Sequence, residues 1–156
     1  MDSMNQRPLA LRLTLALVVG LGTASTQTLA APLDSRLDPS LQSLAALRWQ
    51  HRLIIVDAQS PEPIERLRAA QPAIDERHII WFVRHQGLLK TNLPSPIDAA
   101  LVEELEQRYF NRSDAAVLLV GKDGGIKARA DHLDLPALFA RIDAMPMRRR
   151  EMEAAQ

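Results

Sequence analysis

Runs of apolar residues along the chain predict the strands of a sheet. Three runs are apolar at successive positions and rich in β-branched side chains, which is typical of strands buried on both faces. A weaker fourth run follows Asp123-Gly124, a dipeptide that favours a tight hairpin turn. Residues 86–94 carry no such run and are expected to form a loop. The predicted strands cover residues 53–56, 79–83, 116–120 and 126–130.

A helical period separates the second predicted strand from the third. Ile97, Leu101, Leu105 and Tyr109 recur every four residues, and mostly charged side chains stand between them. This spacing places the four side chains on one face of an amphipathic helix. Weaker apolar stripes predict helices after the first and fourth strands. They consist of Ile64, Leu67 and Ile74, and of Leu135, Leu138, Phe139 and Ile142.

Capping residues and prolines set the expected helix limits. Ser60, which precedes a proline, Asp98 and Asp134 are each placed to accept a hydrogen bond from the first turn of a helix. Pro72 is expected to interrupt the first helix, because proline lacks the backbone N–H of a helix interior. Pro146 is expected to end the last helix for the same reason.

The predicted order is βαβαββα. Strands separated by helices favour right-handed parallel crossovers, and the closing hairpin adds an antiparallel edge. These elements predict a three-layer α/β sandwich of thioredoxin type with a mixed four-stranded sheet. A flavodoxin-like sheet fits less well, because it requires a helix between the last two strands.

The N-terminal 30 residues have the three-part layout of a secretory signal peptide. Arg7 and Arg12 precede the apolar residues 13–21, and small residues lead to an expected cleavage site at Ala30. The alternative is an uncleaved membrane anchor, but the apolar core is shorter than the about 20 residues of a spanning helix. The sequence therefore predicts a periplasmic or secreted protein, with a mobile polar lead-in over residues 31–43.

Composition excludes several classes of function. Cleavage at Ala30 leaves one domain of ordinary size, and it removes two basic and one acidic residue from the 19 of each, so 17 and 18 remain. This near-neutral balance gives no general attraction to nucleic acid or membranes. The chain has no cysteine. A thiol–disulfide oxidoreductase or a cysteine peroxidase is excluded, because both need a thiolate.

Four segments of the chain resemble one protein family. They are residues 47–52, residues 76–77, residues 119–125, and residues 142–149 with Glu151 and Met152. On these segments the chain resembles the "domain of unknown function 4174" family. The resemblance implies a thioredoxin- or peroxiredoxin-like module over residues 44–152, followed by a tail at 153–156. Such modules occur in bacterial exported proteins and in animal extracellular proteins that include sushi-repeat-containing proteins, and no settled activity comes with them.

The chain differs at two places from the redox-active proteins of the thioredoxin-like fold. The first helix is expected near Ser60, where a redox member carries Cys-x-x-Cys, and residues 59–62 hold no cysteine. The position before the third strand is near Ala115, where redox members commonly carry a cis-proline.

A basic surface near the C-terminus is the first candidate site. Arginine side chains bind carboxylates and phosphates through paired hydrogen bonds, so an exported protein or a small anionic ligand is the expected partner. The competing interpretations are a plain hairpin turn at 122–125, a solvated charge run at 148–150, and a tail fastened by Asp143 or Glu151. The candidate binding residues are Arg77, Lys122, Asp123, Arg129, Arg148 and Arg149.

A methionine cluster is the second candidate. Met145, Met147 and Met152 offer thioethers, which favour Cu(I), although core packing is the usual role of methionine. The four histidines show no zinc-ligand spacing. Ser60, Asp57 and His132 have no spacing that indicates a hydrolytic site.

The sequence therefore favours a non-enzymatic binding or scaffold domain without catalytic residues or a cofactor. The alternatives are a periplasmic copper-handling or stress-response protein, and an uncharacterised enzyme. Both tryptophans, Trp49 and Trp81, are expected to be anchors in the core or at its edge.

Overall fold

The computed structural model describes residues 43–155. The predicted signal peptide and all but the last residue of the predicted lead-in lie outside the described residues. In chain order the elements are α1 (Leu44–Leu47), β1 (Arg52–Ala58), α2 (Glu62–Ala69), α3 (Gln71–Glu76), β2 (Ile79–His85), β3 (Leu88–Thr91), α4 (Ala99–Leu105), η3 (Glu106–Phe110), β4 (Val117–Val120), β5 (Ile126–Ala130), α5 (Leu135–Asp143) and α6 (Pro146–Ala154).

The fold is α/β, with a five-stranded mixed sheet in the order β3-β2-β1-β4-β5. β1 is parallel to β2 and antiparallel to β4, and the other two pairs are antiparallel. The three apolar runs do form the central strands, as predicted. The expected four-stranded sheet is wrong by one strand. The expected parallel crossover into the third apolar run is also wrong, since β4 runs against β1.

The additional strand belongs to a β2–β3 hairpin within the segment expected to be a loop. His85 and Leu88 face each other in the register, so only Gln86 and Gly87 form the turn. Both have positive φ, 50° and 74°, as two-residue type I′ hairpin turns require. Glutamine is a weak signal for that conformation, which explains why the sequence did not predict β3.

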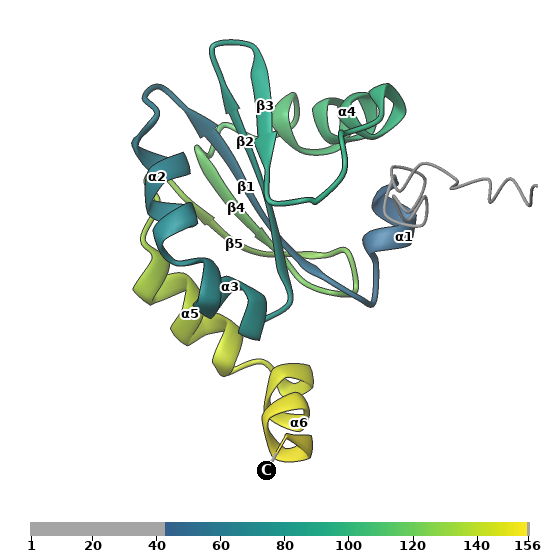
Figure 1. The fold of residues 1–156 in the computed structure, drawn as a ribbon, viewed down its shortest axis with the longest axis vertical. Coiled ribbons are helices and arrows are strands. Elements are labelled where there is room, and N and C mark those ends of the chain that lie inside the picture. Colours follow the sequence, from purple (N-terminus) through teal and green to yellow (C-terminus); the bar gives the residue numbers. More distant parts are fainter. Residues whose placement is uncertain (1–42, 156) are drawn as a thin grey trace, which may run out of the picture. The chain divides into compact units, whose positions relative to one another are not determined.

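Helices cover both faces of the sheet (Figure 1). An apolar layer of side chains lies on each face. Alternate residues of β1 contribute to opposite layers: Ile54 and Val56 pack with α2, α3 and α5, whereas Leu53 and Ile55 pack with α1, α4 and η3. This alternation follows from the two-residue period of a strand. The three-layer arrangement predicted from the sequence is confirmed.

The helix limits agree only in part with the predicted caps. Asp98 and Asp134 accept hydrogen bonds from the first turns of α4 and α5, as expected. Ser60 does not cap α2, because the cap position is Pro61, which offers no side-chain acceptor. Pro72 stands in the first turn of α3, where its missing N–H costs nothing, so the predicted interruption is present.

A π-helical turn, η3, continues α4. The extra residue per turn brings Tyr109 and Phe110 to the core side by side, and both are buried. The four-residue spacing of the sequence accounts for Tyr109 alone. Short π-helical segments occur often at functional sites.

Pro146 begins a helix instead of only ending one. α5 stops at Asp143, and α6 follows with Pro146 at its first position. The basic run at 148–150 therefore lies in the first turns of α6, not in a cap beyond a helix end. Over residues 43–155, no helix has the length and apolar character that a membrane span requires.

Candidate functional site

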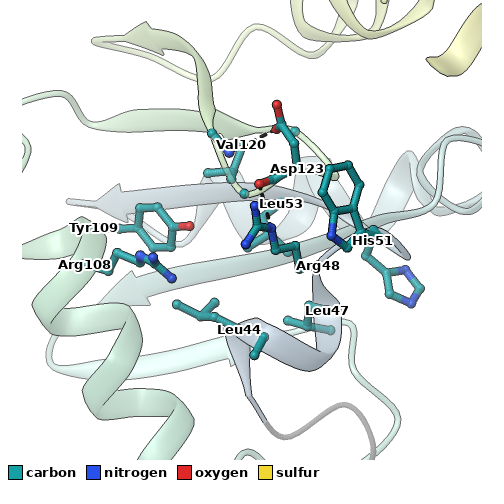
Figure 2. Close-up of a pocket in the computed structure, with 14 residues that line it drawn as sticks. Leu44, Leu47, Arg48, His51, Leu53, Arg108, Tyr109, Val120 and Asp123 are labelled. Carbon is teal, nitrogen blue, oxygen red and sulfur yellow. Dashed lines mark hydrogen bonds between the residues drawn. The ribbon is translucent and has the colours of Figure 1, made fainter. Parts of the chain in front are cut away.

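A groove of about 640 Å³ lies at the amino end of β1, between α1, η3 and the β4–β5 turn (Figure 2). Leu53 of β1 and its register partner Val120 of β4 line it. We call it the α1 groove. Its lining comprises Leu44, Ala45, Leu47, Arg48, Trp49, His51, Leu53, Arg108, Tyr109, Val120, Gly121, Asp123, Gly124 and Gly125.

Beside Asp123 and His51, two arginines and a phenol supply the polar side chains of the α1 groove. Figure 2 shows Arg108 and Tyr109 reaching from η3 toward Arg48. The Nε of Arg48 donates to the backbone oxygen of Asp123 at 2.9 Å, which positions the guanidinium. Burial raises the pKa of Tyr109, although nearby Arg108 opposes the shift. The phenol therefore stays protonated at neutral pH and can donate a hydrogen bond.

Trp49 lies at the groove in a strained conformation. Its φ is 69°, a left-handed backbone that bulky residues rarely adopt. Its N–H donates to the Lys122 oxygen at 2.6 Å, which ties α1 to the β4–β5 turn. The side chain is 59% exposed, and the Arg48 guanidinium lies 5.2 Å from the ring centroid. Of the two tryptophans expected in the core or at its edge, Trp81 is buried as expected, whereas Trp49 is exposed and does not lie in the core.

The predicted glycine-rich turn is a hairpin connection. Gly124 has a φ of 82°, and its N–H bonds to the Gly121 oxygen, while the Gly121 N–H bonds to the Gly125 oxygen. The Gly125 N–H donates to Asp123. These amides are therefore used within the turn. The hydrogen bonds from Lys127, at 2.6 Å, and from Gly125 lower the pKa of Asp123.

At the opposite end of β1, charged side chains form hydrogen bonds and ion pairs with one another. Arg84 contacts both carboxylate oxygens of Asp57, at 2.6 and 3.2 Å, and a Glu106 oxygen at 2.6 Å. Its guanidinium also lies 4.4 Å from the Phe110 ring centroid. The adjacent cavity, lined in part by Asp57, has only about 10 Å³. Because Arg84 occupies the Asp57 carboxylate, Asp57 is not available as a free base for Ser60.

The C-terminal helix is joined to β1 by buried charges. Arg52 is 1% exposed and makes two hydrogen bonds, of 3.1 and 3.2 Å, to Glu151 of α6. Lys122 lies 2.8 Å from the same carboxylate and 3.0 Å from Nδ1 of His78. Burial opposes ionisation of Glu151, but the hydrogen bonds from Arg52 and Lys122 outweigh it and lower its pKa.

A second group of charges continues this arrangement. Arg148 is 4% exposed and contacts Glu76 at 2.5 Å and Asp143 at 3.3 Å. Arg77 contacts Asp143 at 2.6 Å. Burial opposes ionisation of Asp143, but hydrogen bonds from Arg77 and Arg148 lower its pKa. We call the whole set the α6 ion network: Arg52, Glu76, Arg77, Lys122, Asp143, Arg148 and Glu151.

The predicted basic surface is divided by the structure. Arg77, Lys122 and Arg148 meet in the α6 ion network, so the interpretation of 148–150 as a solvated run is wrong for Arg148. The tethering interpretation is confirmed, since Asp143 and Glu151 both pair with arginines. Arg129 and Arg149 are exposed outside the network, and Asp123 lines the α1 groove. A binding role for these six residues stays a prediction.

The sequence did not indicate four groove residues as site residues: Arg48, Trp49, Arg108 and Tyr109. Arg48 belongs to a segment that carries the family resemblance, and the patterns indicate Trp49 and Tyr109 only as packing positions. Their convergence depends on packing between α1 and η3, about 60 positions apart, which no local pattern reports.

The methionine cluster is brought together only in part. Met145 and Met147 line a cavity of about 260 Å³, and Met152 does not. Arg52, Lys122 and Lys127 line the same cavity, and their positive charges oppose binding of a metal cation. Within the described part of the chain, no group of three histidine, aspartate or glutamate side chains is arranged to hold a metal ion. The copper site stays a prediction.

Comparison with known proteins identifies the family. Residues 43–151 match the family model described as "Domain of unknown function (DUF4174)". Neither the curated proteins nor the solved structures contain a match to this chain. The matched segment holds the α1 groove and the α6 ion network through Glu151. The resemblance noted in the sequence is confirmed, and the chain belongs to the DUF4174 family.

Proposed function

We propose that this protein is a non-enzymatic binding domain that holds a small anionic ligand in the α1 groove. The observation that carries this proposal is the pairing of two exposed arginines, Arg48 and Arg108, with an exposed tryptophan around one cavity. Small-molecule sites usually have volumes of about 300–1,000 Å³, and 640 Å³ falls in that range. A small ligand therefore fits this groove better than a folded protein partner.

Arg48 and Arg108 are available for an anion. The Nε of Arg48 donates to the backbone oxygen of Asp123. Within residues 43–155, the two terminal guanidinium nitrogens of Arg48 and the side-chain nitrogens of Arg108 make no hydrogen bond. The acidic residue nearest to them in the lining, Asp123, is occupied by Lys127. The groove therefore has an excess of positive charge that a carboxylate or phosphate would neutralise.

The proposed fold type is thioredoxin-like. Central β1 has a parallel neighbour on one side and the antiparallel β4–β5 hairpin on the other, with helices on both faces. On this view β3 is an addition at the sheet edge. The α1 groove then lies at the amino end of β1, opposite the position where a redox member carries its thiols.

Several features support a role other than catalysis. The chain has no cysteine and is not a thiol oxidoreductase. The cavity lined by Asp57 has only about 10 Å³, and Arg84 occupies the Asp57 carboxylate. The signal-like residues 1–30 support export, so the proposed place of action is the periplasm or the cell exterior.

The test is native mass spectrometry of the full chain after incubation with a small-molecule extract of bacterial periplasm. The Arg48→Glu/Arg108→Glu variant is compared with Arg129→Glu/Arg149→Glu, which reverses two exposed arginines outside the groove. We expect a bound mass on the wild type and on the control variant but not on the groove variant. A mass lost only from the control variant would favour the surface predicted from the sequence, and no bound mass at all would overturn the proposal.

A further inference from the structure

We infer that the ligand of the α1 groove is a planar aromatic carboxylate, an inference that rests on the proposed function. The ring would pack against the exposed indole of Trp49, and the carboxylate would accept hydrogen bonds from Arg48, Arg108 and Tyr109. Three features of the groove lead to this ligand class.

The first feature is the conformation of Trp49. It occupies the position after the C-cap of α1, where the chain turns into the left-handed region. Glycine is the usual residue there because any side chain adds strain. As a helix stop alone, tryptophan is a poor choice. Backbone strain of this kind is found where a side chain is held for function.

The second feature is the unused face of the indole. Trp49 is 59% exposed, whereas Trp81 is 1% exposed. Arg48 lies 5.2 Å from the ring centroid on one side, and with 59% exposure the indole keeps surface on which a second group can pack. Aromatic rings favour offset stacking with other rings, which adds about 0.5–1.5 kcal/mol to the burial of area. A planar ring therefore uses this surface better than a flexible aliphatic chain.

The third feature is the arrangement of donors along the groove. Arg108 and Tyr109 extend from η3 toward Arg48 (Figure 2). Two guanidinium groups and a protonated phenol are donors only, or preferentially donors, at neutral pH. They match a carboxylate, which accepts through two oxygens, and they disfavour an amine.

The floor of the groove is apolar. Leu44, Leu47, Leu53 and Val120 line it and are nearly closed to solvent, with exposures of 7%, 1%, 4% and 0%. The body of the ligand would therefore lie on a well-packed surface without displacing core residues.

The experiment is a titration of the full chain, labelled with ¹⁵N, with three probes of one skeleton. 2-Naphthoate carries both the ring and the charge, decahydro-2-naphthoate keeps the charge but loses planarity, and 2-naphthylmethylamine reverses the charge. The indole N–H signals of Trp49 and Trp81 are followed, because Trp49 reports the groove and Trp81 reports an intact core.

We expect 2-naphthoate to shift the Trp49 signal saturably, with an affinity at least tenfold higher than that of either other probe. Arg108→Gln should weaken 2-naphthoate binding by tenfold or more on this signal. Trp49→Leu should weaken binding as much, followed on the backbone N–H signals of Gly124 and Gly125, which line the groove. The Trp81 signal should stay unchanged in both variants. The matched control, Arg68→Gln, changes an exposed arginine of α2 outside the groove and should bind as the wild type does.

If decahydro-2-naphthoate binds as tightly as 2-naphthoate, the ligand need not be aromatic. If 2-naphthylmethylamine binds as tightly, the ligand need not be a carboxylate. Either result would overturn the inference. No saturable shift with 2-naphthoate would overturn the ligand class. If the native mass spectrum still shows a groove-dependent mass, the proposed function survives that failure. If both experiments are negative, both proposals fall.

Discussion

The carboxylate of Glu151 lies 3.1 and 3.2 Å from two guanidinium nitrogens of Arg52, which stands 99 positions earlier in the chain. Arg52 opens the central strand, and Glu151 is in the last helix. Lys122 approaches the same carboxylate at 2.8 Å. One acidic side chain therefore balances two buried cations and fastens α6 to the sheet.

Removing this carboxylate should destabilise the domain strongly. We expect Glu151→Gln to lower the free energy of unfolding by about 2–3 kcal/mol, because it leaves two buried cations without their partner. Urea denaturation provides the measurement. Glu153→Gln is the matched control: Glu153 is exposed on the same helix, and its replacement should change stability by less than about 0.5 kcal/mol. Equal effects of the two variants would contradict a stabilising role for the Arg52–Glu151 pair.

The stability of the domain should fall with acid in two stages. Burial, with Lys122 next, lowers the pKa of His78 below its ordinary 6.5. The unfolded chain then takes up the proton first, so this contribution is complete above pH 6.5 and is lost as the pH falls toward the folded-state pKa. Glu151 and Asp143 also have lowered pKa values. Their contribution is complete above the ordinary carboxylate range and is lost as the pH falls below about 4.5.

Urea midpoints measured from pH 8 to pH 3 test both stages. His78→Asn should flatten the first stage, since asparagine tolerates the left-handed backbone of His78, whose φ is 50°. Glu151→Gln should flatten the second stage. If the urea midpoint of the His78→Asn variant falls below pH 6.5 as steeply as that of the wild type, groups other than His78 control the first stage.

Two neighbouring arginines of α6 should respond differently to charge reversal. Arg148→Glu places a carboxylate among Glu76, Asp143 and Glu151 in a nearly closed site, so we expect a loss of about 3 kcal/mol or more. Arg149→Glu faces solvent and should change stability by less than about 0.5 kcal/mol. Thermal unfolding of both variants checks this. A stable Arg148→Glu protein would contradict a stabilising role for Arg148 in the α6 ion network.

Replacing Trp49 should separate backbone strain from the role of the indole. Trp49→Gly and Trp49→Ala lose the same ring, but glycine accepts a φ of 69° and alanine does not. We expect the glycine variant to be the more stable of the two by about 1 kcal/mol. Chemical denaturation of the pair gives the difference directly. If the two are equally stable, Trp49 is not strained, and the first argument for an aromatic ligand is lost.

Local sequence patterns were sufficient to predict the elements whose apolar residues follow a regular spacing. The apolar runs of β1, β2 and β4 and the stripes of α4 and α5 were visible in the sequence because each is long and regular. β3 was missed because Leu88 and Lys90 are exposed and its turn uses Gln86. α6 was missed because Pro146 can end one helix or begin the next, and only packing decides between them.

The sequence by itself determined the α/β class, the family and the absence of thiol chemistry, since these depend on local periodicity, on short matched segments and on residue types. The direction of β4, the burial of Arg148 against Glu76, and the placement of Trp49 and Arg108 around the α1 groove depend on the tertiary structure. These depend on contacts between residues tens of positions apart. The sequence does not distinguish a charged side chain that faces water from one that pairs with a distant carboxylate. Only folding brings that carboxylate into contact.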